Sequence, residues 1–186
     1  MGNRERLLDG AKQCLYEKGF TRTTARDIAS AAGTSLAAIG YHFGTTEELL
    51  TQAVYAAVAD WGEDLGRALA AGHDEQAPDR RFEAIWTQVI GTFAEHRPLW
   101  AVQFELVGQA DRLPELRAFL AEAQRRGRAE LAGLFDGGTV ADERVGAFYQ
   151  ALLAGVMTQL LVDPEGAPSA RDLTEALRLV AARWHP

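Results

Sequence analysis

Apolar residues recur at spacings of three and four along almost the whole chain, which is the period of an amphipathic helix. No stretch alternates apolar and polar residues as a half-buried strand does. With 186 residues, of which 47% are hydrophobic and 24% charged, the chain is long enough to bury a core and too apolar to be disordered. The sequence therefore predicts an all-α protein.

The helix boundaries follow from caps and breakers. Gly19 and Gly33 stand where the first two periodic stretches end, and Thr24 with Asp27 forms a capping pair at the start of the second. Pro98 stands where a helix is expected to begin, because proline is tolerated in the first turn. About nine helices are predicted, near residues 3–18, 24–32, 35–43, 46–71, 80–95, 98–110, 114–135, 141–162 and 169–184.

Charge is distributed unevenly along the chain. The first fifty residues hold six basic and six acidic groups, so the net charge of −7 belongs to the rest. A net negative charge by itself disfavours a nucleic-acid-binding protein. A neutral N-terminal segment can nevertheless dock on DNA if its positive groups share one face, and the acidic remainder then resists nonspecific binding.

Three features of the sequence indicate the cellular compartment of the protein. The single cysteine, Cys14, cannot form a disulfide within the chain, and its place in a helical pattern indicates a small buried residue. The N-terminus leads into an amphipathic stretch and not into the apolar core of a signal peptide. Residues 145–162 carry no charge, but they are short for a membrane span, and a helix covered by packed partners explains them better. We therefore expect a cytoplasmic protein with no membrane association.

Three short predicted helices precede residue 46, and Ala32-Gly33-Thr34 forms a short turn between the second and third. This arrangement indicates a helix-turn-helix on a supporting helix. In the third helix, Ile39 and Phe43 are four residues apart and are expected to face inward. The opposite face is small at its start and aromatic at its end, and small residues let a helix sit deep in the major groove.

Several side chains in this segment suit phosphate oxygens. Hydroxyls and free N–H groups at helix N-termini bind anions, which applies to Thr24, Thr34 and Ser35. Tyr41 and His42 can also reach the DNA backbone. An exposed helix end packed on the fourth helix explains these two aromatic residues equally well, so both interpretations stay open.

The same segment resembles a known family. Gly19-Phe20-x-x-Thr23-Thr24-x-x-x-Ile28-Ala29-x-x-Ala32-Gly33-x-Ser35, followed by Tyr41-His42-Phe43 and Glu47-x-Leu49-Leu50, is similar to the signature of the TetR family of bacterial regulators. The resemblance covers about residues 5–55. It implies a helix-turn-helix domain over 1–46 and a helical effector-binding and dimerisation domain over 47–186. It also implies a homodimer formed by the last two helices, and repression relieved by a small molecule.

The resemblance also implies residue roles, and some residues depart from it. Arg26 matches a base-reading position. Members often have glycine at the place of Ala37, tyrosine at Gly40, lysine at Thr46 and a polar reader at Leu36. Without the lysine, the salt dependence of DNA binding should be shallower by about one unit of slope. The candidate DNA-binding residues are Thr24, Arg26, Thr34, Ser35, Leu36, Ala37, Ala38, Gly40, Tyr41, His42 and Thr46.

The stretch 145–162 is apolar almost all round, and the last predicted helix carries a second apolar stripe. Two such helices per subunit can form a four-helix interface in a symmetric dimer. Burial within the chain is the alternative, but a symmetric DNA reader needs two recognition helices about 34–36 Å apart. The candidate interface residues are Ala147, Ala151, Leu152, Gly155, Leu177 and Trp184.

Aromatic residues with a few polar groups among them are typical of a ligand pocket, although such a set is also typical of an ordinary core. The candidates are Trp61, Trp86, Phe93, Trp100, Phe104, Glu105, Gln109, Phe148 and Tyr149. If Glu105 faces inward it must be paired or protonated. A cationic ligand would satisfy it, and so would Arg97 or Arg112.

The sequence shows no glycine-rich phosphate loop, no Gly-x-Ser-x-Gly motif and no metal-binding pair, and its four histidines are scattered. We therefore expect no enzyme, cofactor or metal. The leading hypothesis is a ligand-responsive repressor whose partners are a palindromic double-stranded operator, a second copy and an unidentified small molecule. The alternative is a helical adaptor that binds only proteins, and such an adaptor would not need the helix-turn-helix residues.

Overall fold

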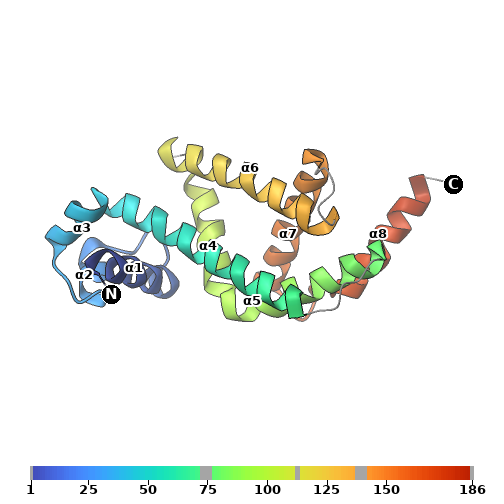
Figure 1. Cartoon of the computed structure of the whole chain (residues 1–186), viewed down its shortest axis with the longest axis horizontal. Coiled ribbons are helices and arrows are strands. Elements are labelled where there is room, and N and C mark those ends of the chain that lie inside the picture. Colours follow the sequence, from blue (N-terminus) through green and yellow to red (C-terminus); the bar gives the residue numbers. More distant parts are fainter. Residues whose placement is uncertain (1, 72–76, 112–113, 137–141, 185–186) are drawn as a thin grey trace. The chain divides into compact units, whose positions relative to one another are not determined.

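The computed structural model describes residues 2–71, 77–111, 114–136 and 142–184, and every regular element in these ranges is a helix (Figure 1). The prediction of an all-α fold is confirmed. The eight helices described are α1 (Asn3–Lys18), α2 (Ala25–Ala31), α3 (Leu36–Phe43), α4 (Thr46–Ala71), α5 (Pro78–Gln109), α6 (Pro114–Asp136), α7 (Glu143–Val162) and α8 (Ala170–Trp184).

Eight helices replace the expected nine because α5 runs through the proposed boundary at Pro98. The prediction that Pro98 starts a helix is wrong. A proline inside a helix removes one backbone hydrogen bond and usually kinks or ends it. Here Phe93 lies buried before the proline, and Leu99 and Trp100 lie buried directly after it. Burial on both sides outweighs the lost hydrogen bond and keeps the helix continuous.

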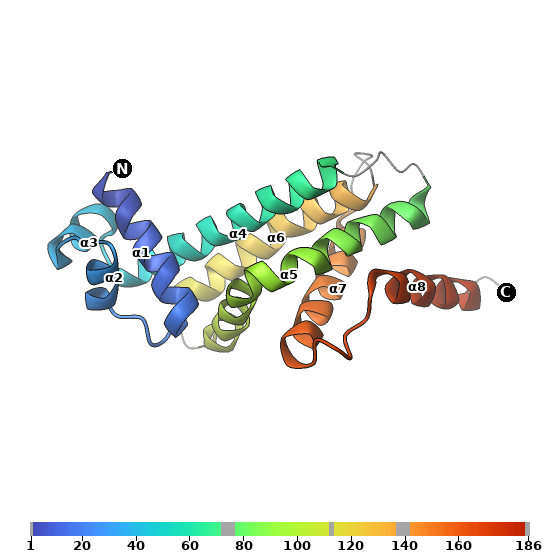
Figure 2. The same cartoon turned by 90° about the horizontal axis from the view of Figure 1, so that it is seen from below.

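The packing divides the chain into two units. Unit 1 comprises residues 1–63 and 96–120, and unit 2 comprises residues 64–95 and 121–186. Unit 1 therefore holds α1 to α3, the first part of α4, the end of α5 and the start of α6. Figure 2 shows α1, α2 and α3 gathered beside the first turns of α4.

The core of unit 1 is built on α1. Leu7, Ala11 and Leu15 are buried at the predicted spacing, and Cys14 lies buried beside them as a free thiol. Burial raises the pKa of the Cys14 thiol. Gly19 ends α1, as the sequence predicts, with φ +81° and ψ 174°.

Helices α2 and α3 have seven and eight residues, too few to be stable alone in water. Their buried residues, chiefly Ile28 on α2 and Ile39 and Phe43 on α3, join the same core. Fully burying one such side chain stabilises a fold by about 1.5–3 kcal/mol. Tertiary packing therefore holds both helices in place.

Unit 2 is held by an aromatic cluster and by polar contacts between its helices. Phe82 of α5 lies 5.7 Å from Phe135 of α6 and 6.2 Å from Tyr149 of α7 between ring centroids. Arg128 of α6 donates to the Gln150 side chain on α7 at 3.1 Å. These contacts join α5, α6 and α7 inside the unit.

Gly10 sets how closely α1 can approach α2. A Cβ at this position would lie 2.9 Å from the Ala32 backbone nitrogen and 3.2 Å from the Ile28 carbonyl oxygen. We expect Gly10→Ala to lower the free energy of unfolding by about 1–3 kcal/mol through overpacking. Gly62→Ala is the control, because nothing lies within 4 Å of its Cβ position, and it should raise stability by about 0.5–1 kcal/mol. Urea denaturation measures both variants, and a Gly10→Ala protein as stable as the wild type would contradict this account.

Candidate nucleic-acid interface

Helix α3 turns one side to the core of unit 1 and the other to solvent. Ile39 and Phe43 are buried, as the four-residue spacing predicts. On the other side, Tyr41 is 86% exposed and Leu36 is 48% exposed. Two large side chains that pack little on their own chain are available to contact a partner.

Small residues lie between these two side chains. Ala37 and Gly40 are exposed, and Ala38 is half-buried. A Cβ built at Gly40 would meet nothing within 4 Å, so the surface around it is open. The rings of Tyr41 and His42 meet edge to face with centroids 4.8 Å apart, and His42 is half-buried. The face can therefore approach another surface closely at its start and presents a ring at its end.

The turn between α2 and α3 is closed by backbone hydrogen bonds. The Thr34 N–H donates to the Ala29 carbonyl at 3.0 Å, and the Gly33 N–H donates to the Ser30 carbonyl at 3.2 Å. Gly33 has φ +58°, a conformation that glycine adopts at no steric cost. Ser35 is the N-cap of α3, and its exposed side chain makes no capping hydrogen bond. Its hydroxyl is thus free to contact an external acceptor.

The start of α2 is fixed by the capping pair that the sequence predicts. The Thr24 hydroxyl accepts from the Asp27 N–H at 3.3 Å and donates to the Asp27 carboxylate at 2.8 Å. Lys18 of α1 pairs with the same carboxylate at 2.6 Å. The hydrogen bonds from Lys18 and Thr24 lower the pKa of Asp27 from 3.8 to about 2. This network ties the N-terminus of α2 to the end of α1.

Arg26 differs from Lys12 and Lys18, the two cations of this segment that form ion pairs. Lys12 pairs with Asp60 at 3.0 Å and Lys18 pairs with Asp27 at 2.6 Å, so both charges are neutralised within the chain. Arg26 is exposed, and no residue in the described part of the chain forms an ion pair or a hydrogen bond with it. Its guanidinium is available to an external acceptor.

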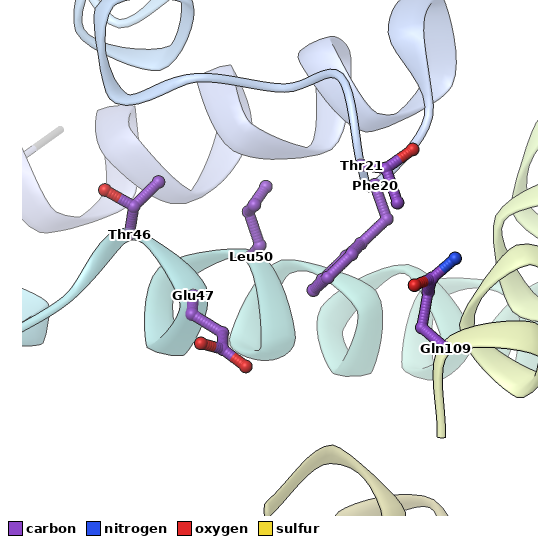
Figure 3. Close-up of a pocket in the computed structure, with 6 residues that line it drawn as sticks. All are labelled: Phe20, Thr21, Thr46, Glu47, Leu50 and Gln109. Carbon is purple, nitrogen blue, oxygen red and sulfur yellow. The ribbon is translucent and has the colours of Figure 1, made fainter. Parts of the chain in front are cut away.

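A hollow of about 330 Å³ lies between the loop after α1, the start of α4 and the end of α5 (Figure 3). It is lined by Phe20, Thr21, Thr46, Glu47, Leu50 and Gln109. Thr46, which was predicted to contact DNA, and Gln109, which was predicted to contact a ligand, both line this hollow. Figure 3 shows the Phe20 ring between Leu50 and Gln109.

The other predicted ligand residues of unit 1 lie in its interior. Trp61 and Trp100 are buried with ring centroids 5.1 Å apart, edge to face. The buried indole N–H of Trp100 has no acceptor among the described residues. Phe104 and Glu105 are half-buried.

Glu105 makes contacts that the sequence did not suggest. Its carboxylate accepts hydrogen bonds from the backbone of Phe20 and from Thr21, in the loop after α1. The proposed partner Arg112 lies outside the described residues. No pattern could reveal this link, because its partners are more than eighty residues apart in sequence.

The remaining predicted ligand residues belong to unit 2. Trp86 and Phe93 are buried, and the Trp86 indole N–H is a second buried donor with no acceptor among the described residues. Tyr149 stacks on Phe135 with centroids 3.9 Å apart, whereas Phe148 is 49% exposed. The structure therefore divides the predicted ligand set into two groups, one in each unit.

The predicted interface residues lie on faces of α7 and α8 that the single chain leaves open. Ala151 and Gly155 are exposed, and Trp184 is 77% exposed. Leu177 is also exposed, whereas Ala147 and Leu152 are half-buried.

Helix α7 has a mean hydropathy of 1.6 over its most apolar stretch, of which 22% is buried, and by length and composition alone it could cross a membrane.

Among the residues that the structure describes, no group of three or more histidine, cysteine, aspartate or glutamate side chains is placed to hold a metal ion.

Two family models match the chain. Residues 7–53 match the model described as bacterial regulatory proteins, tetR family. Residues 77–183 match the model described as tetracyclin repressor-like, C-terminal domain, and this match alone covers more than half of the chain.

Individual proteins are similar over different shares of the chain. The HTH-type transcriptional repressor AcnR of Corynebacterium efficiens is 39% identical over 49 residues, which are 26% of this chain and only 26% of that repressor. The solved structure of SCO7518 from Streptomyces coelicolor A3(2) is 27% identical, with a TM-score of 0.70 over 96% of this chain and 97% of that one. The multidrug binding protein EbrR, solved in complex with imidazole, is 25% identical, with a TM-score of 0.66 over 98% of this chain and 89% of its own.

The hydrogen bonds of Asp27 predict how the stability of the protein depends on pH. Because folding lowers the pKa of Asp27 from 3.8 to about 2, its contribution to stability is complete above about pH 4 and is lost as the pH falls toward 2. The wild type should therefore be more stable than Asp27→Asn at neutral pH, and the difference should shrink toward about pH 2. Urea denaturation at a series of pH values measures this difference, and a gap that does not change with pH would exclude the proposed ion pair.

Proposed function

We propose that this chain, which belongs to the tetR family of bacterial regulatory proteins, is a transcriptional repressor that binds a palindromic DNA operator as a homodimer. A small molecule releases it from the operator. In this proposal residues 1–46 bind DNA, and residues 47–186 bind the effector and the second subunit. The observation that carries it is the open, solvent-facing side of α3, together with the unpaired guanidinium of Arg26 on α2.

The exposed face of α3 has the chemistry of a major-groove reader. The Ala37 methyl and the Leu36 side chain can contact thymine methyl groups, and the small surface at Gly40 lets the helix approach the base edges. Arg26 can donate two hydrogen bonds to a guanine, which discriminates against other bases by about 1–3 kcal/mol. Few polar readers remain on α3, so DNA shape contributes a larger share of the specificity.

Phosphate contacts position this face. Thr24 and Ser35 lie at helix N-termini, where hydroxyl and N–H groups suit phosphate oxygens. Tyr41 and His42 are proposed to reach the DNA backbone from the C-terminal end of α3. Thr34, before the start of α3, and Ala38, one turn before His42, complete the proposed interface. Thr46 stands where relatives often have a lysine, and Glu47 beside it is acidic. The salt dependence of binding is accordingly shallower by about one unit of slope than with that lysine.

The homodimer is supported by the open apolar faces of α7 and α8. Ala151 and Gly155 on α7 allow close approach of another helix, and Leu177 with Trp184 supplies apolar area on α8. A second copy that covers both helices would bury these side chains in a four-helix interface. Such an interface also accounts for the apolar composition of α7 without a membrane.

The effector is supported by two buried indole N–H groups, those of Trp86 and Trp100. A buried donor without an acceptor costs about 1–3 kcal/mol, and a ligand oxygen or nitrogen would remove that cost. Each of the two donors lies among aromatic side chains, which suit a planar or aromatic ligand. The similar protein EbrR was solved with imidazole, so a small nitrogen heterocycle is a reasonable first probe.

The proposal includes no catalysis and no cofactor, and it places the protein in the cytoplasm, where an operator is accessible. Selection from a random duplex DNA pool, with sequencing of the bound fraction, tests it. Enrichment of one inverted repeat is the expected result. Weak binding that salt removes, with no enriched sequence, would favour the protein-binding adaptor instead.

Arg26 and Tyr41 should contribute to operator binding in different ways. We expect Arg26→Ala to weaken binding by about 1–3 kcal/mol and to relax specificity at one base pair. Tyr41→Ala should weaken binding to all sequences alike, because it loses a backbone contact. Arg117→Ala is the control, since this exposed arginine lies on α6. Fluorescence anisotropy with the selected operator and single-base variants measures each effect, and wild-type affinity in both variants would contradict the interface.

A matched pair of alanines tests the dimer. Ala181 follows Leu177 by four residues and precedes Trp184 by three, so it shares their face of α8, whereas Ala182 points about 100° away. Both alanines are exposed in the single chain. We expect Ala181→Asp to give monomers and Ala182→Asp to leave dimers, because only the first places a charge in the interface. Analytical ultracentrifugation measures the oligomeric state of both variants. A dimeric Ala181→Asp protein would exclude this face of α8 as the dimer interface.

A further inference from the structure

The loop between α1 and α2 is held from a distant part of the chain. Glu105, near the end of α5, accepts from the Phe20 N–H with one carboxylate oxygen at 2.8 Å. Its other oxygen accepts from the Thr21 N–H at 2.8 Å and from the Thr21 hydroxyl at 2.6 Å. All of these residues belong to unit 1. Three donors thus converge on one anionic group.

Gly19 gives independent evidence that the loop is shaped around this carboxylate. Its φ of +81° disfavours any residue with a side chain. A Cβ at this position would also lie 2.6 Å from Glu105 Oε2. The backbone conformation favours glycine, and a side chain at this position would also displace the Glu105 carboxylate, so the loop fits closely over the end of α5.

The loop leads directly into the proposed DNA-binding surface. The Thr23 hydroxyl donates to the Gly19 carbonyl at 2.7 Å, which stiffens the segment that follows the Glu105 contacts. The next residue, Thr24, is the N-cap of α2, and Arg26 is the second residue of that helix. A displacement of the loop therefore displaces the start of α2.

The other end of this connection is the helix that carries most of the proposed effector residues. Helix α5 holds Trp86, Phe93 and Trp100, and Glu105 follows Trp100 by five residues on the same helix. A shift or rotation of the end of α5 would move the carboxylate away from its three donors.

We propose that Glu105 is the positioning residue that couples α5 to the α1–α2 loop, so that the three hydrogen bonds hold α2 in the geometry that binds the operator and their loss weakens binding. This inference rests on the proposed function, and it assigns the regulation of the DNA-binding surface to one carboxylate.

The chemistry of the contact requires an acceptor on both oxygens. Burial acts to raise the pKa of Glu105, but the hydrogen bonds from Thr21 and Phe20, with the nearby charge of Arg22, outweigh burial and lower it. The group is therefore ionised at neutral pH, and its hydrogen bonds are charge-assisted. A glutamine has the same shape but offers one acceptor oxygen, and its NH₂ group would face at least one N–H donor.

The test compares Glu105→Gln with Glu95→Gln in the full-length protein. Glu95 is an exposed glutamate on the same helix, so both variants remove one negative charge from α5. We expect Glu105→Gln to bind the selected operator about tenfold more weakly than the wild type, and Glu95→Gln to bind it unchanged. Fluorescence anisotropy measures the affinity, and ultracentrifugation verifies that each variant is still a dimer.

Hydrogen exchange separates coupling from a purely structural role. Coupling is reciprocal, so operator binding in the wild type should slow amide exchange at the end of α5, about threefold over residues 96–109. This protection should persist in Glu95→Gln and disappear in Glu105→Gln. If Glu105→Gln does not fold, Thr21→Val removes only the hydroxyl donor, and it should weaken both the affinity and the protection about threefold.

The outcomes distinguish the two proposals. A wild type that enriches no duplex contradicts the proposed function and this inference with it. A wild type that binds its operator, with Glu105→Gln (or Thr21→Val) binding equally well or still protecting α5, contradicts the coupling alone.

Discussion

Apart from Thr46 on α4, the residues proposed to contact DNA depend on the packing of two helices that are too short to exist by themselves. Helices α2 and α3 have seven and eight residues, and an isolated helix below about 12–15 residues is marginal in water. Ile28, Ile39 and Phe43 place them on the core around α1, and the approach of α1 to α2 is possible only because Gly10 has no side chain. The exposed face of α3 contributes little to stability, so its residues can be those that suit binding to a partner. This separation explains why small and apolar residues such as Ala37 and Leu36 can face solvent there.

The electrostatics of the N-terminal segment follow the same division. Two of its six cations are neutralised within the chain, in the ion pairs of Lys12 with Asp60 and Lys18 with Asp27. Arg4, Arg6 and Arg22 donate hydrogen bonds to neutral groups of the chain. The guanidinium of Arg26 has no partner among the described residues and therefore gains weight in the proposal. A protein that neutralises few phosphates binds nonspecific DNA weakly, because counterion release supplies most of that binding. In the proposed function, shape, apolar contact and the fixed presentation of α3 supply a larger share of the affinity, which makes rigid positioning of the loop before α2 more important.

Local rules predicted the parts of the fold that local contacts determine. The spacing of apolar residues predicted the helices. The pair Thr24 and Asp27 predicted the start of α2, because a capping pair involves residues only three apart in sequence. The continuous helix through Pro98 could not be predicted, since it depends on burial of Phe93 and Leu99 on either side. The hydrogen-bond partners of Glu105 could not be predicted from the sequence either. The sequence marked it as a polar residue among apolar ones that needs a partner, but its partners Phe20 and Thr21 come from another part of the chain.

Two buried indole N–H groups lie on the helix that carries Glu105. Trp86 and Trp100 are both on α5, fourteen residues apart, and both bury an N–H without an acceptor in the described part of the chain. Such donors are rare in native interiors, and each costs about 1–3 kcal/mol. A ligand that accepts a hydrogen bond from either one gains that energy and acts directly on α5. In the proposed coupling, a ligand at Trp100, which lies in the same unit as Glu105, acts on the α1–α2 loop through the end of α5 and three hydrogen bonds. In this proposal the ligand changes the operator-binding geometry without touching α2 or α3.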